Sequence, residues 1–218
     1  MITQNIQKIR GELPSEVCLV AVSKFQPLEA LQEAYDAGQR VFGENRPQEL
    51  SAKAQALPGD IEWHFIGHLQ TNKLKMVLPY ASMVESVDTL HLLEAVDAWG
   101  RANCKVIDVL LELHIGIEET KQGFCEEEIL DILFRADKFP FVRFCGLMGM
   151  ASHTDDEETI DADFSRIDSF MAYIVDLFPE LDSLRYLSIG MSDDWRIAVR
   201  HGSTHVRIGT AIFGPRKI

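Results

Sequence analysis

The chain alternates, about eight times along its length, between a short run of apolar residues and a longer segment whose apolar residues recur at helical spacing. Short runs rich in Val, Ile and Phe predict buried strands, and the longer segments predict helices. The first run, residues 17–24, is apolar almost throughout, which is typical of a strand buried on both faces, and the helix after it is bounded by Pro27 and Gly38. The other strands are expected at residues 40–45, 61–67, 83–86, 106–114, 142–148, 186–189 and 205–208. The longest helix is expected over residues 157–177.

This alternation predicts an α/β fold, a single (β/α)8 TIM barrel. Such barrels usually have about 250 residues, with about 200 as the lower end. At 218 residues the chain fits one domain spanning 1–218 and leaves no room for a second. The alternative is an open doubly wound sheet, which usually carries a glycine-rich phosphate loop after its first strand. Residues 23–27, Ser-Lys-Phe-Gln-Pro, contain no glycine, which favours the barrel.

Charge and hydropathy limit the partners of the chain. It carries 21 basic and 34 acidic side chains, a net charge of -13, so its surface repels nucleic acid and anionic lipid. No apolar run approaches the roughly 18 residues that span a bilayer, and the first residues lack the pattern of a signal peptide. We expect a cytoplasmic protein with no nucleic acid or membrane partner. The cysteines form no CxxC pair, and we expect reduced core residues at Cys18, Cys104, Cys125 and Cys145.

The chemistry of such a barrel belongs at the carboxyl-terminal ends of its strands. Lys24 follows the first strand there. A lysine at the mouth of a buried strand can be partly desolvated, which lowers its pKa and frees the amine as a nucleophile that forms Schiff bases. A solvated lysine at the end of a strand is the alternative, and position alone leaves both open.

The loops after the seventh and eighth strands have the features of a phosphate site. The backbone N–H groups of Gly209 and Thr210 can converge on an anion, and Ser192 supplies a hydroxyl donor from the other loop. Barrels commonly bind phosphate at these two loops. Because the first strand adjoins the eighth in a closed barrel, this phosphate would lie near the Lys24 amine. The combination describes a pocket for pyridoxal 5'-phosphate (PLP).

The motifs around these residues resemble those of the pyridoxal phosphate homeostasis proteins, whose single barrel is related to the N-terminal domain of alanine racemase. The resemblance covers essentially the whole chain. It rests on the following segments, in this order: Ala21-Val22-Ser23-Lys24, Phe42-Gly43-Glu44-Asn45, Trp63-His64-Phe65-Ile66-Gly67, Gly146-Leu147-Met148, Gly190-Met191-Ser192-Asp193-Asp194 and residues 202–214.

The resemblance implies a protein that holds PLP as a Schiff base on Lys24, takes part in intracellular PLP homeostasis and supplies PLP to apoenzymes. Arg207 would be the arginine that faces the pyridine nitrogen. Asn45 and Met148 would line the ring. The implied cofactor-binding set is Lys24, Asn45, Met148, Ser192, Arg207, Gly209 and Thr210.

Three positions depart from the family pattern, and all three concern the rim of the pocket. The family more often has Gly-Glu-Asn-Tyr where residues 43–46 of this chain are Gly-Glu-Asn-Arg, so that Arg46 replaces the tyrosine. It more often has Gly-Pro-Leu-Gln where residues 67–70 are Gly-His-Leu-Gln, so that His68 replaces the proline. The continuation after Met148, which includes His153, also differs. The roles of these side chains stay open. Lys121 offers a second amine near the rim, although a surface lysine is the simpler interpretation.

Bound PLP alone would also suit an amino acid racemase. The residues that racemisation needs besides PLP therefore distinguish a racemase from a carrier. An arginine beside the pyridine nitrogen keeps it unprotonated and weakens the ring as an electron sink. Racemisation also needs an acid/base group on each face of the planar carbanion, and in alanine racemase a tyrosine from an additional domain supplies the second. The tyrosines here fall on helices or at the start of a strand, and the chain stops at Ile218. We expect a carrier without catalytic residues, with a weak PLP-dependent amino acid racemase as the alternative.

Hydrolytic and metal chemistry fit the sequence less well. Ser192 lacks the second glycine of a GxSxG nucleophile elbow. The pairs His64 with His68 and His201 with His205 have the spacing of zinc ligands on a helix, but a glycine interrupts each pair. We therefore expect no metal site.

Overall fold

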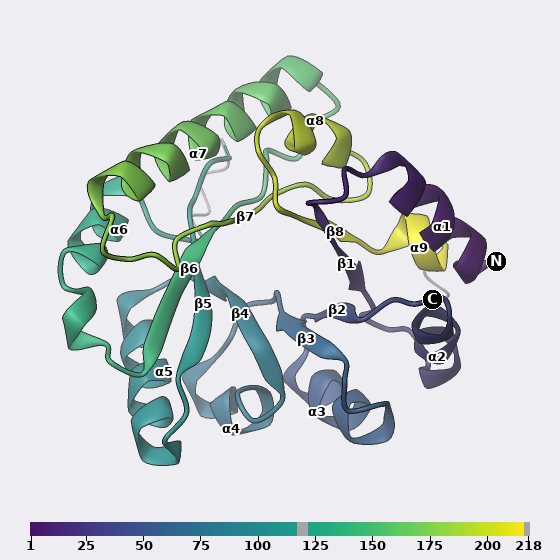
Figure 1. Ribbon diagram of the computed structural model, residues 1–218, viewed down its shortest axis with the longest axis horizontal. Coiled ribbons are helices and arrows are strands. Elements are labelled where there is room, and N and C mark those ends of the chain that lie inside the picture. The colour runs from purple at the N-terminus through teal and green to yellow at the C-terminus, as the bar shows by residue number, and fades with distance from the viewer. Residues whose placement is uncertain (117–121, 216–218) are drawn as a thin grey trace.

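The fold is a closed barrel of eight parallel strands surrounded by helices (Figure 1). The computed structural model describes residues 1–116 and 122–215, so Lys121 lies outside the described residues. The strands pair in chain order, and β8 also pairs with β1, which closes the ring. They are β1 (Cys18–Val22), β2 (Val41–Glu44), β3 (Glu62–Phe65), β4 (Ala81–Val87), β5 (Ile107–Glu112), β6 (Val142–Met148), β7 (Tyr186–Ser188) and β8 (His205–Ile208). The closure confirms the predicted barrel and excludes the open doubly wound sheet.

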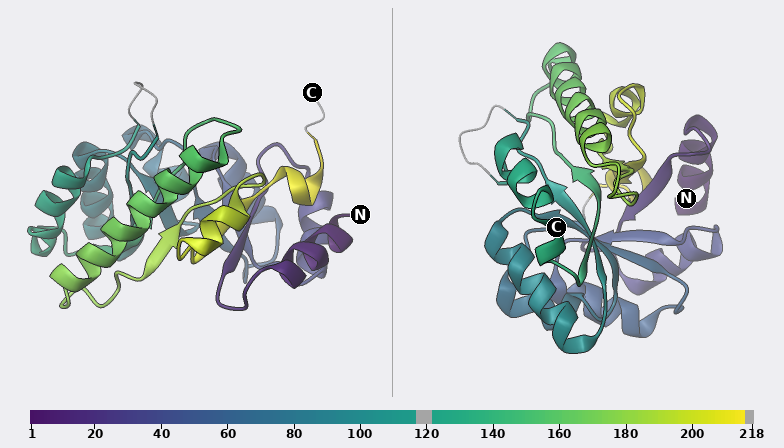
Figure 2. Two further views of the ribbon diagram at one scale, coloured as in Figure 1. Left: turned by 90° about the horizontal axis from the view of Figure 1, so that it is seen from above. Right: turned by 60° about the vertical axis from the view of Figure 1, so that its left-hand side comes forward.

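The helices lie outside the strands and connect them (Figure 2). They are α1 (Ile2–Glu12), α2 (Leu28–Asp36), α3 (Pro47–Ala56), α4 (Leu74–Val77), α5 (Leu90–Asn103), α6 (Glu126–Leu133), α7 (Glu157–Leu177), α8 (Trp195–Arg200) and α9 (Thr210–Phe213), with 3-10 turns at Thr71–Lys73 and Ala136–Lys138. The helix α7 has its predicted bounds. The helix α1 was not predicted, although it buries Ile6 and Ile9. It packs beside α9, where the Asn5 side-chain amide donates to the Ile212 carbonyl at 2.9 Å.

Apolar side chains form two separate clusters. The larger one joins outward-facing strand residues to the helices, and Phe42, Phe65 and Phe164 are among its fully buried members. The smaller one comprises Met83, Leu110, Cys145 and Met148, with Tyr186 packed against it. Polar and charged residues of the strands are also buried, among them His64, Glu85, Glu112 and Arg207. Apolar packing therefore holds the helices to the barrel, while charged strand residues are buried alongside the apolar ones.

Two of the cysteines are not core residues, contrary to expectation. Cys104 and Cys125 are exposed, whereas Cys145 is buried and Cys18 is partly buried. The reason is local, because Cys104 ends α5 in the left-handed conformation and Cys125 is the residue before α6. Helix ends lie at the surface even when their neighbours in sequence are apolar. Among the described residues, no helix is long and apolar enough to cross a membrane.

Candidate functional site at the barrel mouth

The turn that carries Lys24 follows β1 at the carboxyl-terminal end of the barrel. Lys24 is half-buried. The next residue, Phe25, has a positive φ of 64°, which is uncommon for a residue with a side chain. The guanidinium of Arg46 lies over the Phe25 ring at 4.2 Å. Arg46, one of the rim residues whose role the sequence left open, therefore supports the turn after β1.

The loops after β7 and β8 meet each other as predicted. The backbone N–H of Gly209 donates to Ser192 Oγ at 3.4 Å. Thr210 is the exposed first residue of α9, so its N–H belongs to the first turn, where backbone donors have no partner within the helix. Gly190, with a φ of 93°, turns the chain after β7. A hydroxyl and two backbone N–H groups thus lie together in a form that suits a phosphate.

The phosphate-type loops also lie against the end of β1. In the β1–β8 pair, Ala21 is opposite Ile208. A Cβ atom added at Gly209 would lie 3.2 Å from the Val22 carbonyl oxygen and 3.3 Å from Val22 Cβ. Gly209 thus allows the anion-binding loop to approach the strand that leads into Lys24. The predicted adjacency of the first and eighth strands is confirmed.

Arg207 lies inside the barrel and is only 4% exposed. Its Nη1 donates to the Ser188 carbonyl at 2.6 Å and to Ser188 Oγ at 2.7 Å, and its Nη2 donates to the Gly149 carbonyl at 2.9 Å. Burial lowers the pKa of Arg207, and the carboxylates of Glu85 and Glu112 oppose this shift. A guanidinium has five N–H donors, so these bonds leave two of them for another acceptor.

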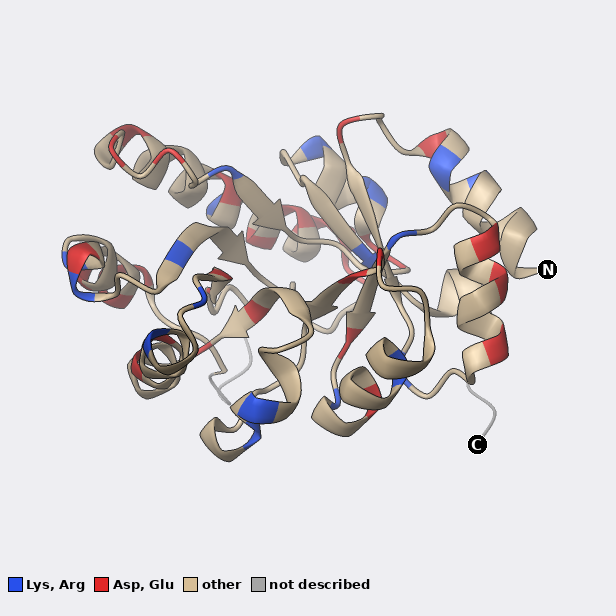
Figure 3. Cartoon of the chain, turned by 60° about the horizontal axis from the view of Figure 1, so that its bottom comes forward, with Lys and Arg blue, Asp and Glu red and all other residues tan. Residues whose placement is uncertain are grey.

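Glu85 is the buried counter-ion of this arginine. Its carboxylate accepts from Ser188 Oγ at 2.5 Å, lies 2.6 Å from His64 Nδ1 and is 3.9 Å from Arg207 Nη1. Burial alone would raise the pKa of Glu85, but the hydrogen bond and charge of His64, with Arg207, lower it to about 2. Glu85 was not predicted as a site residue, although an acidic residue within an apolar strand is a signal that the sequence contains. Figure 3 shows that acidic positions lie on the strands as well as on the outer helices.

Asn45 and Met148 lie at strand ends in different environments. Asn45 follows β2 and is half-buried, and its side-chain Oδ1 is buried without a hydrogen-bond partner. Met148 ends β6, is 1% exposed and packs with Met83, Leu110 and Cys145. Asn45 therefore offers an unused polar group, while Met148 can only contribute apolar surface from within the barrel.

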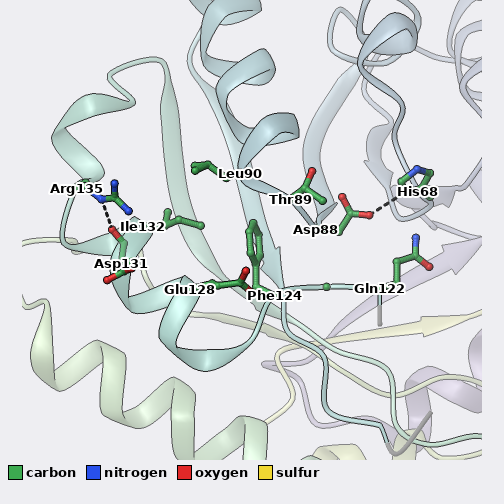
Figure 4. A pocket seen from close by; sticks show the side chains of 11 residues that line it. His68, Asp88, Thr89, Leu90, Gln122, Phe124, Glu128, Asp131, Ile132 and Arg135 are labelled. Carbon is green, nitrogen blue, oxygen red and sulfur yellow. Dashed lines mark hydrogen bonds and ion pairs between the residues drawn. The ribbon is translucent and has the colours of Figure 1, made fainter. Parts of the chain in front are cut away.

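A pocket of about 540 Å³ opens beside the mouth, between α5 and α6 (Figure 4). His68 lines this pocket, and its Nδ1 lies 2.8 Å from Asp88 Oδ2. The rim histidine His68 therefore belongs to this pocket. His153 is exposed in the loop after β6. The pocket is lined by side chains after β3, β4 and β5 and on α6, so it is separate from the Lys24 and Gly209 loops.

Glu112, at the end of β5, makes the stability of the protein depend on pH. Burial, reinforced by Asp88, raises the pKa of this carboxyl from 4.5 to about 7. The folded state therefore binds a proton that the unfolded chain releases above about pH 4.5, so the free energy of unfolding falls as the pH rises from about 4.5 to about 7.

Glu112→Gln removes the free-energy cost of ionising this buried carboxyl above about pH 7. Urea unfolding should show that its free energy of unfolding, relative to that of the unsubstituted protein, increases by roughly 1 to 3 kcal/mol between about pH 5 and about pH 8. The exposed Glu62→Gln on β3 is the matched control and should show no such increase. An equal difference at both pH values would contradict the assignment.

Comparison with known proteins gives a consistent family match. The family described as "Alanine racemase, N-terminal domain" matches residues 1–217. The pyridoxal phosphate homeostasis protein of Vibrio alginolyticus is 36% identical over 230 residues, covering 99% of this chain and 97% of that protein. The protein of that name from Aquifex aeolicus is 37% identical over 223 residues, covering 99% and 96%.

Solved structures show the same relationship. The PipY protein of Synechococcus elongatus, solved with PLP bound, superposes with a TM-score of 0.89 at 34% identity, covering 98% of this chain and 100% of that chain. Alanine racemase from E. faecalis superposes with a TM-score of 0.77 at 19% identity, and the match covers 99% of this chain but 58% of that enzyme. The second comparison shows a shared fold alone.

Proposed function

Because the chain belongs to the pyridoxal phosphate homeostasis proteins, within the family of alanine racemase N-terminal domains, we propose that it binds PLP at the carboxyl-terminal mouth of its barrel. Its function is PLP homeostasis. The relative from Synechococcus elongatus was solved with PLP bound, which supports the assignment of this cofactor. The whole chain, 1–218, acts as one PLP-binding barrel in the cytoplasm.

One observation carries the proposal: the loop of Gly209 contacts both Ser192 and the end of β1. Gly209 N–H reaches Ser192 Oγ, and the Gly209 backbone approaches Val22, two residues before Lys24. The phosphate is held by Ser192 with the N–H groups of Gly209 and Thr210. Bound PLP supplies an aldehyde that reacts with amines. Lys24 is the residue whose amine would hold the cofactor covalently, by condensing with that aldehyde with release of one water molecule.

The net charge of -13 makes these local donors necessary. A dianionic phosphate is repelled by the overall field of the protein, so nearby N–H groups and a cation must offset that repulsion. Arg207 is the buried cation within the barrel, and it would face the pyridine nitrogen with its two remaining N–H groups. Asn45 and Met148 line the ring, Asn45 through its unpartnered Oδ1.

The placement of the tyrosines favours a carrier over a racemase. Tyr35 lies on α2, Tyr173 on α7 and Tyr186 at the start of β7, the end of the strand opposite the mouth. Tyr80 lies in a turn before β4 and not on a helix as expected. None of the four is at a carboxyl-terminal strand end, where a second acid/base group would act. This placement favours a carrier, which holds the reactive aldehyde of PLP and supplies it to PLP-dependent apoenzymes.

Reduction with borohydride tests the proposal, because it converts a Schiff base into a stable secondary amine. The purified protein, incubated with PLP, reduced and dialysed, should keep one phosphopyridoxyl group, and peptide mass analysis should place it on Lys24. Lys24→Ala should retain none. Lys8→Ala, which removes an exposed lysine of α1, is the control and should label fully.

Equal labelling of Lys24→Ala and the unsubstituted protein would contradict the role of Lys24. The racemase alternative has its own assay, in which single enantiomers of amino acids are incubated with the PLP-loaded protein. Turnover at roughly 1 per second or faster, which is typical of enzymes, would favour a racemase over a carrier.

A further inference from the structure

Lys53 is a buried lysine on α3 whose three ammonium hydrogens all have partners. Its side chain is 8% exposed. Its Nζ donates to Glu44 Oε1 at 2.6 Å, to the Ser23 carbonyl at 2.8 Å and to Glu49 Oε2 at 2.9 Å. An ammonium has three N–H donors, so this set of contacts is complete. We call Glu44, Glu49 and Lys53 the α3 clamp.

The α3 clamp holds the peptide bonds on both sides of Lys24. The Ser23 carbonyl, which accepts from Lys53, belongs to the peptide bond that precedes Lys24. The Phe25 N–H, which belongs to the peptide bond that follows Lys24, donates to Glu49 Oε2 at 2.8 Å. Two flanking peptide planes determine the φ and ψ of the residue between them. The clamp therefore fixes the backbone of Lys24, and with it the direction in which the side chain leaves the backbone.

Further contacts of the clamp strengthen this restraint. Ser23 Oγ donates to Glu44 Oε1 at 2.7 Å. Phe25 occupies the left-handed region, which is unfavourable for a residue with a side chain. The hydrogen bond from its N–H to Glu49 offsets part of this cost, so without the clamp the turn would relax towards more favourable backbone angles.

Stability alone is a poor explanation for three charges at this place. Desolvation of a buried ion pair can cost as much as the attraction between its members provides, and apolar residues of similar size often serve as well. Glu44 is fully buried and its Oε2 has no hydrogen-bond partner. What the charged groups provide, and apolar groups could not, is hydrogen bonding to the two peptide groups beside Lys24.

We propose that Glu44, Glu49 and Lys53 are positioning residues, which hold the β1–α2 turn so that the Lys24 amine points at the aldehyde carbon of PLP. This inference rests on the proposed function. The clamp acts through the two peptide groups beside Lys24. Loss of the clamp reduces capture of the aldehyde and leaves the phosphate loops after β7 and β8 unchanged.

The test uses the double variant Glu44→Gln/Lys53→Met. Lys53→Met alone would leave the buried Glu44 carboxylate without its cation, which by itself can unfold a protein. The double variant removes one positive and one negative charge, so the net charge is kept, and both replacements match the originals closely in size. Lys105→Met is the matched control, because Lys105 Nζ also donates to a carbonyl, that of Leu78 at 2.7 Å, at the opposite end of the barrel.

Affinities for two ligands distinguish a loss of Lys24 positioning from a general loss of folding. Pyridoxal 5'-phosphate is captured by the amine, whereas pyridoxine 5'-phosphate has the same ring and phosphate but carries an alcohol in place of the aldehyde. The double variant should bind pyridoxal 5'-phosphate about 10 to 100-fold more weakly, since small errors in the placement of a reacting group cost this much. Its affinity for pyridoxine 5'-phosphate should stay within about twofold of the unsubstituted protein, as should both affinities of Lys105→Met.

Unchanged affinity for pyridoxal 5'-phosphate in the double variant would overturn the proposal. A parallel loss of both ligands would also overturn it, because the clamp would then only support the fold. Amide hydrogen exchange in the PLP-free protein gives a second readout. The Phe25 N–H should exchange at least 10-fold faster in the double variant, because its acceptor, Glu49 Oε2, loses the Lys53 ammonium that holds it in place. If Lys24 of the unsubstituted protein forms no Schiff base, the proposed function fails, and the exchange rate still decides whether the clamp restrains the turn.

Discussion

Gly209→Val should lower the affinity for PLP about 100-fold or more, while the protein stays folded, because two charge-assisted phosphate contacts are lost at roughly 1.5 to 3 kcal/mol each. A bare Cβ at this position already lies 3.2 Å from the Val22 carbonyl oxygen and 3.3 Å from Val22 Cβ. Two further methyl groups cannot fit against this backbone. The loop must move away from β1, which also separates Gly209 N–H from Ser192 Oγ.

Calorimetric titration with PLP measures this loss, and two comparisons identify its cause. Gly59→Val is the control, because a Cβ at Gly59, between α3 and β3, meets nothing within 4 Å. Pyridoxal, which lacks the phosphate, should be trapped on Lys24 by borohydride equally well in Gly209→Val and in the unsubstituted protein. Retention of full PLP affinity by Gly209→Val would place the phosphate elsewhere.

Glu85→Gln should lower the free energy of unfolding by about 3 kcal/mol near neutral pH, although the amide matches the carboxylate in size. Arg207 would lose its nearest carboxylate, at 3.9 Å, and His64 would lose a charged partner at 2.6 Å. A buried guanidinium without a counter-ion is expensive, and no cavity contributes to the loss. Urea unfolding measures the difference, and the exposed Glu62→Gln should change it by no more than about 0.5 kcal/mol.

The pH dependence of this difference identifies the charge as its source. The pKa of Glu85 is lowered to about 2 in the folded protein, so its charge stabilises the fold above the ordinary pKa of 4.5. This stabilisation is lost as the pH falls from about 4.5 to about 2, where the folded carboxyl also takes up a proton. The gap between Glu85→Gln and the unsubstituted protein should therefore close over that range. A gap that does not depend on pH would point to packing instead.

Local patterns predicted the fold well because each β/α unit is encoded by contiguous residues. All eight strands appear where their apolar runs predicted them, and α7 has its predicted ends. The exceptions have two different causes, a distant partner for α1 and a local helix end for the two cysteines. The helix α1 is stabilised by its contact with α9, two hundred residues away in the chain, and Cys104 and Cys125 are exposed because they lie at helix ends.

Some residues of the candidate site could likewise be proposed from local sequence, and others only from the folded structure. Lys24, Ser192, Gly209 and Thr210 could be proposed from sequence because each lies in the loop that follows a strand and has a distinctive chemical type. Glu85, Glu112 and Lys53 could not be assigned from position alone. They lie within a strand, at the end of a strand and within a helix, and their importance depends on what surrounds them after folding.

The sequence by itself determined the order of strands and helices, and it determined which side chains follow each strand, because both are properties of short contiguous segments. Only the tertiary structure decided which charges meet. Lys53 reaches the carbonyl before Lys24 because α3 packs beside the β1–α2 turn. Glu85 meets Ser188, which is 103 residues away, because the ring of strands closes and brings their side chains together inside it.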